Sequence, residues 1–212
     1  MTLTLVIGTK RYSSWSLRPW LALKAAGAEF REIEITLRQP DTKAEILKHS
    51  PSGKVPLLID DGLRVWDSLA ICEYVAERFP DARLWPEDPV ARAVARAVSA
   101  EMHSGFVPLR QNCQMDLCLD APMADIPAEV SADVERIDAL WRDCRGRFGQ
   151  DGPFLFGRFS VADAMYAPVV TRMRTYHLPL TPASRAYCAA IAAMPAMAEF
   201  IAAAGGGEAS SG

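Results

Sequence analysis

The sequence has no surplus of positive charge. Its 212 residues carry 23 Lys and Arg against 26 Asp and Glu, which gives a formal net charge of −3. A nucleic-acid-binding protein normally presents a basic face to the phosphate backbone. We therefore expect no nucleic-acid partner.

Long apolar runs and a secretory leader are also missing. Arg, Lys or Glu interrupts every apolar segment before it reaches the roughly 20 residues that span a bilayer. Residues 1–8 contain neither a basic leader nor a long apolar core. We expect no membrane partner and a cytoplasmic location.

Disulfide and metal-site patterns are absent as well. The five cysteines are odd in number and form no Cys-x-x-Cys pair, which is typical of buried thiols in a reducing compartment. The histidines, His49, His103 and His177, show no metal-ligand spacing. We expect no metal.

What is present is an ordinary composition for a soluble protein, half hydrophobic and 23% charged. The first third alternates strand and helix patterns: residues 3–7, 17–26, 30–35, 41–49, 55–59, 63–66 and 69–79. This predicts an α/β domain of order βαβαββα, with a mixed sheet because Asp61-Gly62 makes an antiparallel hairpin.

The rest of the chain has only helical patterns. Three prolines within 80–89 indicate a linker, and helices are expected at 90–104 with a bent continuation to 119, and at 128–148, 160–175, 183–194 and 195–204. We predict an N-terminal domain over 1–79, a linker over 80–89, an all-α domain over 90–204 and a disordered tail over 205–212.

Two features near the hairpin suit a peptide-like ligand with a carboxylate. Pro56 fits a strand start, which would leave the Val55 backbone able to pair with an extended peptide. Asp67 and Ser68 stand where a helix N-cap belongs, and a helix N-terminus attracts anions. The same residues also fit an ordinary hairpin and an ordinary cap.

Pro19 constrains the first helix. Proline is tolerated in the first turn of a helix, which predicts Ser16 as the N-cap. Ser13 and Ser14 would then lie in the preceding loop, with hydroxyls free to act on a ligand.

Four motifs, in this order and spacing, carry a resemblance to a known family. They are Ser13-Ser14-Trp15-Ser16-Leu17-Arg18, Ser52-Gly53-Lys54-Val55-Pro56-Leu57-Leu58, Asp67-Ser68-Leu69-Ala70-Ile71 and Ser160-Val161-Ala162-Asp163. With the link Leu84-Trp85-Pro86-Glu87-Asp88, they resemble the cytosolic glutathione transferases. The resemblance covers nearly the whole chain and implies a thioredoxin-like N-terminal domain. The serine motif is closest to the zeta-like bacterial members, relatives of maleylacetoacetate isomerase.

The resemblance implies a set of glutathione contacts. Pro56 would be a cis proline, and the Val55 backbone would pair with the cysteinyl part of glutathione. Asp67 and Ser68 would hold the γ-glutamyl end. Lys54, or less directly His49, would approach the glycyl carboxylate.

Ser13 is the first candidate for activating the glutathione thiol. Lowering a thiol pKa from about 8.5 by about two units requires about 3 kcal/mol in favour of the anion. A hydroxyl donor and the positive end of a helix together can supply most of this. Ser13 matches the serine of the serine-type classes, Ser14 is the second candidate, and Tyr12 is a third.

One position departs from the zeta pattern. Zeta-class isomerases carry a cysteine after the serine pair, and this chain has Trp15 there. Trp15 could pack over the thiol or line the electrophile pocket, or it could be a half-buried aromatic at a helix start. The departure weakens the isomerase interpretation.

The electrophile site is expected between the two domains, where concave pockets concentrate. The candidates are Met102, Phe106, Arg110, Met115, Tyr166, Arg172 and Met173, most of them equally compatible with a core position. An arginine facing this cleft would suit an acidic substrate, so the electrophile is expected to be hydrophobic or acidic. Asp163 has the place of a structural helix cap.

The main hypothesis is a glutathione transferase that uses glutathione as cosubstrate. The alternatives are a zeta-type glutathione-dependent cis-trans isomerase and a non-catalytic glutathione-binding module. A thiol-disulfide reductase is disfavoured because the first helix has no cysteine. The family resemblance also implies a homodimer.

Overall fold

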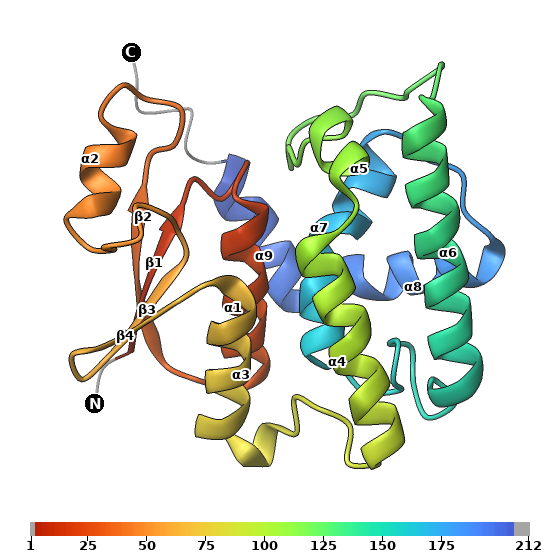
Figure 1. Ribbon diagram of the computed structural model, residues 1–212, viewed down its shortest axis with the longest axis horizontal. Coiled ribbons are helices and arrows are strands. Elements are labelled where there is room, and N and C mark those ends of the chain that lie inside the picture. The colour runs from red at the N-terminus through yellow and green to blue at the C-terminus, as the bar shows by residue number, and fades with distance from the viewer. Residues whose placement is uncertain (1–2, 206–212) are drawn as a thin grey trace.

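The computed structural model describes residues 3–205 and has an α/β half followed by a helical half (Figure 1). The α/β half has the elements β1 (Leu3–Gly8), α1 (Ser14–Ala25), β2 (Phe30–Ile35), α2 (Thr42–Leu47), β3 (Leu57–Asp60), β4 (Leu63–Trp66) and α3 (Ser68–Arg78). This is the predicted βαβαββα order. The expected α/β fold is confirmed.

The sheet has the strand order β2-β1-β3-β4. β1 pairs with β2 in parallel, from Leu3 opposite Phe30 to Gly8 opposite Ile35, and with β3 antiparallel. The β3–β4 hairpin turns at Asp61 and Gly62, both with positive φ, as a tight two-residue turn requires. The mixed sheet is therefore as predicted.

Helices cover both faces of the sheet. α2 lies on one face, and α1 and α3 lie on the other, between the sheet and the helical half (Figure 1). A small apolar cluster under α2 contains Val6, Ile35, Ile46 and Leu57. α1 packs against α3 on one side and against α7 on the other, so it is central to the molecule.

The helical half begins after a short 3-10 turn, η1 (Pro80–Ala82). Its helices are α4 (Pro89–Ser104), α5 (Val107–Asn112), α6 (Ala128–Phe148), α7 (Val161–Thr175), α8 (Pro182–Ala192) and α9 (Pro195–Gly205). α7 opens with the predicted capping box between Ser160 and Asp163. α7 is the buried central helix of this half (Figure 1).

Three expected boundaries are corrected. α1 starts at Ser14 with Ser13 as its N-cap, so Pro19 lies inside the helix and not in its first turn. The bent continuation of α4 stops at Asn112 and does not reach 119. Gly205, the first residue of the predicted tail, ends α9, and 206–212 lie outside the described residues.

One large core joins the two halves. It runs from Leu5 of β1 and Trp20 of α1 to Trp141 of α6 and Phe200 of α9, all of them buried. All five cysteines are free thiols, and Cys118 is the exposed one. Across residues 3–205 no single helix is both long and apolar enough to cross a membrane, although the bent pair α8 and α9 meets those limits together.

Candidate functional site

Three serines stand at the start of α1. Ser13 and Ser14 are buried at the helix mouth, and Ser16 is fully buried one turn further on. The Ser13 hydroxyl lies 2.7 Å from the Ser16 hydroxyl and makes no cap hydrogen bond to its own helix. The Ser13 hydroxyl therefore has a partner inside α1, and its action on a ligand stays a prediction. The Ser14 hydroxyl has no hydrogen-bond partner among the described residues.

The approach to β3 has the geometry of a strand-addition site. The Val55–Pro56 peptide bond is cis, as the resemblance implied, and β3 begins directly afterwards at Leu57. Val55 is half-buried, and within residues 3–205 its backbone N–H and C=O have no hydrogen-bond partner. An extended peptide could pair with these two groups.

Asp67 is the N-cap of α3, as predicted. Its side chain accepts hydrogen bonds from the N–H groups of Leu69 at 2.9 Å and Ala70 at 3.3 Å, and its backbone has a positive φ of 75°. The carboxylate also lies 2.7 Å from His103 Nε2 of α4. Burial alone would raise the pKa of Asp67, but these hydrogen bonds hold it below its ordinary value. Asp67 thus links the start of α3 to the helical half.

Arg18 of α1 is a buried cation behind Ser68. Its side chain is 0% exposed, and its Nη1 donates to Ser68 Oγ at 3.4 Å. Among residues 3–205, its Nε and Nη2 have no hydrogen-bond partner. Burial, together with the positive charges of Arg110 and Arg172, lowers the pKa of Arg18 to about 9. The start of α3 therefore combines a helix N-terminus with a buried positive charge, on which the Asp67 carboxylate acts less strongly than the two neighbouring cations.

Trp15 lies between two guanidinium groups. The Arg18 guanidinium carbon is 4.2 Å from its ring centroid and that of Arg110 is 4.7 Å away. The His103 ring meets the indole edge-on at 5.3 Å. Trp15 is half-buried, so it fills the junction between the α/β half and the helical half next to the serines.

The predicted electrophile residues are mostly interior. Arg110 is half-buried, and its Nε and Nη2 donate to the carbonyl oxygens of Gly105, Met102 and His103 at the end of α4. Arg172 is 4% exposed, and it donates to the carbonyl oxygens of Cys113 and Pro168. Two bonds to the backbone hold this guanidinium largely in the interior, and a role for Arg172 at the electrophile site stays a prediction. Met102, Phe106, Met115, Tyr166 and Met173 are buried in the core.

The residues expected at the glycyl end of glutathione lie near the surface. Lys54 is exposed, His49 is half-buried, and within 3–205 neither side chain has a hydrogen-bond partner. Tyr12 directly precedes Ser13 in the sequence, and the guanidinium carbon of Arg38 lies 3.9 Å from its ring centroid.

No three His, Cys, Asp or Glu side chains in the described part of the chain are grouped so that they could hold a metal ion.

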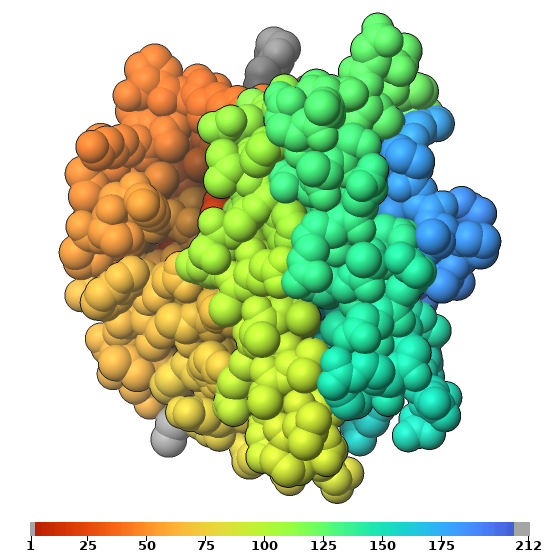
Figure 2. Space-filling model, turned by 45° about the vertical axis from the view of Figure 1, so that its right-hand side comes forward, coloured from red at the N-terminus to blue at the C-terminus, as the bar shows by residue number. Residues whose placement is uncertain are grey.

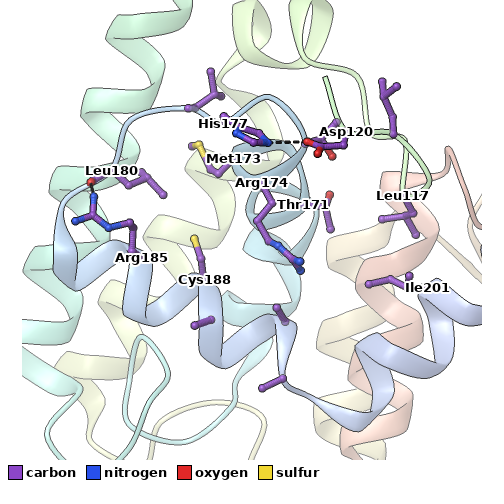
Figure 3. Close-up of a pocket in the computed structure, with 16 residues that line it drawn as sticks. Leu117, Asp120, Thr171, Met173, Arg174, His177, Leu180, Arg185, Cys188 and Ile201 are labelled. Atoms are coloured by element: carbon purple, nitrogen blue, oxygen red, sulfur yellow. Dashed lines mark hydrogen bonds and ion pairs between the residues drawn. The ribbon is translucent and has the colours of Figure 1, made fainter. Parts of the chain in front are cut away.

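The surface is hollowed where the two halves meet. Figure 2 shows this hollow between the orange region after β2 and the lime-green helices α4 and α5, with red atoms of the N-terminal part at its floor. A cavity of about 1030 Å³ lies elsewhere, between α7, α8, α9 and the 117–120 segment (Figure 3). None of the predicted glutathione-contacting residues lines this cavity.

Comparison with known families decides which family the chain belongs to. The family described as glutathione S-transferase, N-terminal domain, matches residues 12–78, and glutathione S-transferase, C-terminal domain, matches residues 127–203. This chain belongs to the glutathione S-transferase family. The two matches fall on the α/β half and on the helical half.

Relatives of this glutathione S-transferase family member include proteins named as isomerases and proteins named as transferases. A probable maleylacetoacetate isomerase of Caenorhabditis elegans is 30% identical over 176 residues, covering 80% of this chain and 78% of that protein. Glutathione S-transferase GstB of Escherichia coli K12 is 29% identical over 141 residues, 66% of this chain and 68% of that protein. The fold is also that of a Burkholderia glutathione transferase homolog with bound glutathione, at a TM-score of 0.73, 21% identity and coverage of 96% and 98%.

Sequence reasoning missed the contributions of Ser16, Arg18 and His103. Ser16 was placed at the N-cap, but it lies inside α1 and bonds to Ser13. Arg18 could have been noticed, because it borders the apolar face formed by Leu17, Trp20 and Leu21. The contact between His103 and Asp67 joins residues 36 positions apart, and no local pattern signals it.

Proposed function

We propose that this protein is a glutathione transferase that binds glutathione along the Val55–Pro56 approach to β3 and activates its thiol at the start of α1. The observation that carries the proposal is the Ser13 hydroxyl at the positive end of α1, which does not cap its own helix. A hydroxyl in that position can donate to a sulfur anion, and the helix dipole adds to its stability.

The peptide backbone of glutathione would pair with Val55. The N–H and C=O of Val55 have no partner in residues 3–205, and a cysteinyl residue lying alongside could bond to both. Lys54 and His49 would lie toward the glycyl carboxylate. This contact gives binding and leaves the sulfur to the serines.

The γ-glutamyl carboxylate would bind at the N-terminus of α3. Ser68 offers its hydroxyl and its backbone N–H there, while Asp67 would accept from the γ-glutamyl amino group. The buried charge of Arg18 behind Ser68 favours an anion at this place. An anion here would add to the partial balance that the Asp67 carboxylate gives the Arg18 charge.

The electrophile would enter the hollow between the two halves. Trp15, held between Arg18 and Arg110, would form its wall, so a planar or apolar small molecule suits it better than one that needs a free arginine. Attack by the thiolate on this molecule gives the conjugate.

A glutathione-dependent cis-trans isomerase is the second candidate. The similarity to proteins named maleylacetoacetate isomerase supports it. In that reaction the thiolate adds to a double bond and then leaves, so glutathione is regenerated. Trp15 stands where zeta-class isomerases carry a cysteine, which supports the transferase as the first choice.

The test compares wild type with Ser13→Ala and Ser14→Ala, using a chlorodinitrobenzene-type electrophile and a maleyl diacid. We expect conjugation with stoichiometric loss of glutathione, and a loss of about 100-fold in kcat for Ser13→Ala. Turnover of the diacid without loss of glutathione would make the isomerase the correct reading. Glutathione binding with no turnover of any electrophile would indicate a binding module.

We also propose the division of the chain into a glutathione-binding domain over 1–79, a linker over 80–89 and a helical domain over 90–204. All four strands precede residue 79, and α4 begins at Pro89. A cytoplasmic homodimer is proposed from family membership. Sedimentation at micromolar concentration would check the dimer.

A further inference from the structure

Ser16 occupies a fully enclosed position in the first turn of α1. Its side chain is 0% exposed, and its oxygen accepts the backbone N–H of Gly8, at the end of β1, at 3.1 Å. Its other hydrogen-bond partner among the described residues is the Ser13 hydroxyl, 2.7 Å away. Ser16 therefore bridges the end of β1 and the start of α1, and it cannot touch a ligand.

The direction of the Ser13–Ser16 hydrogen bond follows from counting donors. A serine hydroxyl has one proton to donate and two lone pairs to accept with. If Ser13 donated to Ser16, the Ser16 oxygen would receive two protons, from Gly8 and Ser13, and its own proton would have no acceptor. An unsatisfied donor in a buried position is costly. If Ser16 donates to Ser13, every group on Ser16 is satisfied.

We propose that Ser16 is a positioning residue for the transferase reaction: it donates its proton to the Ser13 oxygen and thereby directs the Ser13 proton at the glutathione sulfur. The chain of hydrogen bonds runs from Gly8 N–H to Ser16, from Ser16 to Ser13, and from Ser13 to the thiolate. Each bond polarises the next, which strengthens the last one. No proton is transferred along the chain.

This inference rests on the proposed function, and it also selects between the two serines at the helix mouth. Ser14 has no such donor behind it among the residues the structure describes. Its proton has no fixed direction, whereas the Ser13 proton has one imposed by Ser16. The Ser13 hydroxyl is therefore the pre-organised donor.

The test measures the pKa of the thiol of enzyme-bound glutathione, from thiolate absorbance in the ultraviolet, in wild type and in Ser16→Ala. We expect a rise of about one unit in Ser16→Ala, which lowers the rate at neutral pH about tenfold. The two enzymes should converge at alkaline pH, where the thiol is ionised in both. Glutathione KM should change by less than about twofold, because Ser16 touches no ligand.

A double-mutant cycle separates positioning from a general structural effect. Because Ser16 acts through Ser13, Ser13→Ala,Ser16→Ala should show the same thiol pKa as Ser13→Ala alone. Ser99→Ala is the matched control: Ser99 is also fully buried, and its hydroxyl donates to Ala95 O of α4. It should leave the thiol pKa at the wild-type value. Ser16→Cys has the same shape, is slightly larger and is a weaker donor, so it should give an intermediate pKa and serves if Ser16→Ala does not fold.

Two results overturn the inference while the proposed function stands. In the first, the wild-type enzyme lowers the pKa of the bound glutathione thiol, and both Ser16 variants lower it by the same amount. The other is a rate loss that is uniform across pH, or that persists in full on the Ser13→Ala background. A wild-type protein that does not bind glutathione would overturn both proposals together.

Discussion

Arg18 is a buried cation that no carboxylate of residues 3–205 contacts directly. Within that range its Nε and Nη2 lack hydrogen-bond partners, and the cations Arg110 and Arg172 act on its pKa more strongly than the Asp67 carboxylate does. Burying a charge without a counter-charge costs free energy of folding. Such a residue destabilises the ligand-free protein, and its positive charge favours an anion at the start of α3.

Replacing Arg18 by methionine should therefore stabilise the fold and weaken glutathione binding. We expect the free energy of unfolding without ligand to rise by about 1–3 kcal/mol, as when other buried charges are replaced by apolar side chains. Glutathione KM should rise about tenfold, equivalent to about 1.4 kcal/mol. Urea denaturation and steady-state kinetics measure the two effects.

Arg174→Met is the matched control for that variant. Arg174 is an exposed arginine on α7 with no hydrogen-bond partner in the described part of the chain, so its loss should change neither quantity. Weaker folding of Arg18→Met with unchanged glutathione KM would contradict the assignment of Arg18 to an anion site.

The contribution of Asp67 to the free energy of unfolding should depend on pH. Its folded-state pKa is lowered, so its carboxylate stabilises the fold above its ordinary pKa of about 3.9, and this stabilisation is lost as the pH falls through the folded-state value. Asn is also a good N-cap, so Asp67→Asn should mainly weaken the contact with His103. The cost should be about 1 kcal/mol or less, since the pair is partly exposed.

Urea denaturation of wild type and Asp67→Asn between pH 3 and 7 measures this difference. The two curves should differ at neutral pH and converge in the acid range below the ordinary aspartate pKa of about 3.9. A difference that is constant across the whole range would mean that the Asp67 charge does not contribute to stability.

At the scale of elements, the cap of α7 should be the most sensitive to mutation. Asp163 is fully buried and accepts hydrogen bonds from Leu155 N–H and from both the N–H and the hydroxyl of Ser160. Asp163→Ala would leave these donors unsatisfied in the core. We expect a loss of about 3 kcal/mol or more in the free energy of unfolding.

Asp88→Ala is the corresponding change at an exposed cap. Asp88 caps α4 through a single bond to Ala91 N–H, so its loss should cost only about 1 kcal/mol. Chemical denaturation of both variants gives the comparison. Equal costs at the two helices would refute the special role of the buried cap.

The sequence predicted most elements because local signals and packing agree in them. Asp61-Gly62 suits only a tight turn, and the apolar periodicity of α6 is unbroken from Ala128 to Phe148. The start of α1 was misplaced because the local preference of Pro19 was given precedence. In the structure, Leu17, Trp20 and Leu21 are buried in the core, and this packing outweighs the one backbone bond that a proline removes.

The candidate site was predictable only where a motif names the residue. Val55, Pro56, Asp67 and Ser68 lie on short motifs, and the cis Val55–Pro56 bond and the N-cap position of Asp67 are as expected. The roles of the arginines depend on contacts between distant segments. Arg172 bonds to Cys113, 59 positions away, and no spacing rule could tell that its side chain faces the interior.

At the scale of the whole molecule, the continuous core should make unfolding a single transition. α1 packs against both α3 and α7, and buried Trp20 and Trp141 lie in the two halves of one apolar cluster. Separating the halves would expose the face of α1 that meets α7. We expect tryptophan fluorescence and far-ultraviolet circular dichroism to give coincident urea curves.

Two separated transitions would show that the halves unfold independently. A matched pair of variants, Trp20→Phe and Trp141→Phe, would then assign each transition to one half. If unfolding is a single transition, the midpoint of the fluorescence curve of each variant should equal the midpoint of the circular dichroism curve of the same variant.

The distribution of thiols has a practical consequence. Cys118 is exposed, while Cys72, Cys113, Cys144 and Cys188 are buried. A maleimide dye added to the native protein should therefore couple once per chain, at Cys118, without any engineered substitution. Cys118 follows Leu117, whose N–H bonds to Arg11 O, close in sequence to the serines of α1. A dye at Cys118 would make the protein, with its sequence unchanged, a fluorescent reporter of movement between its two halves.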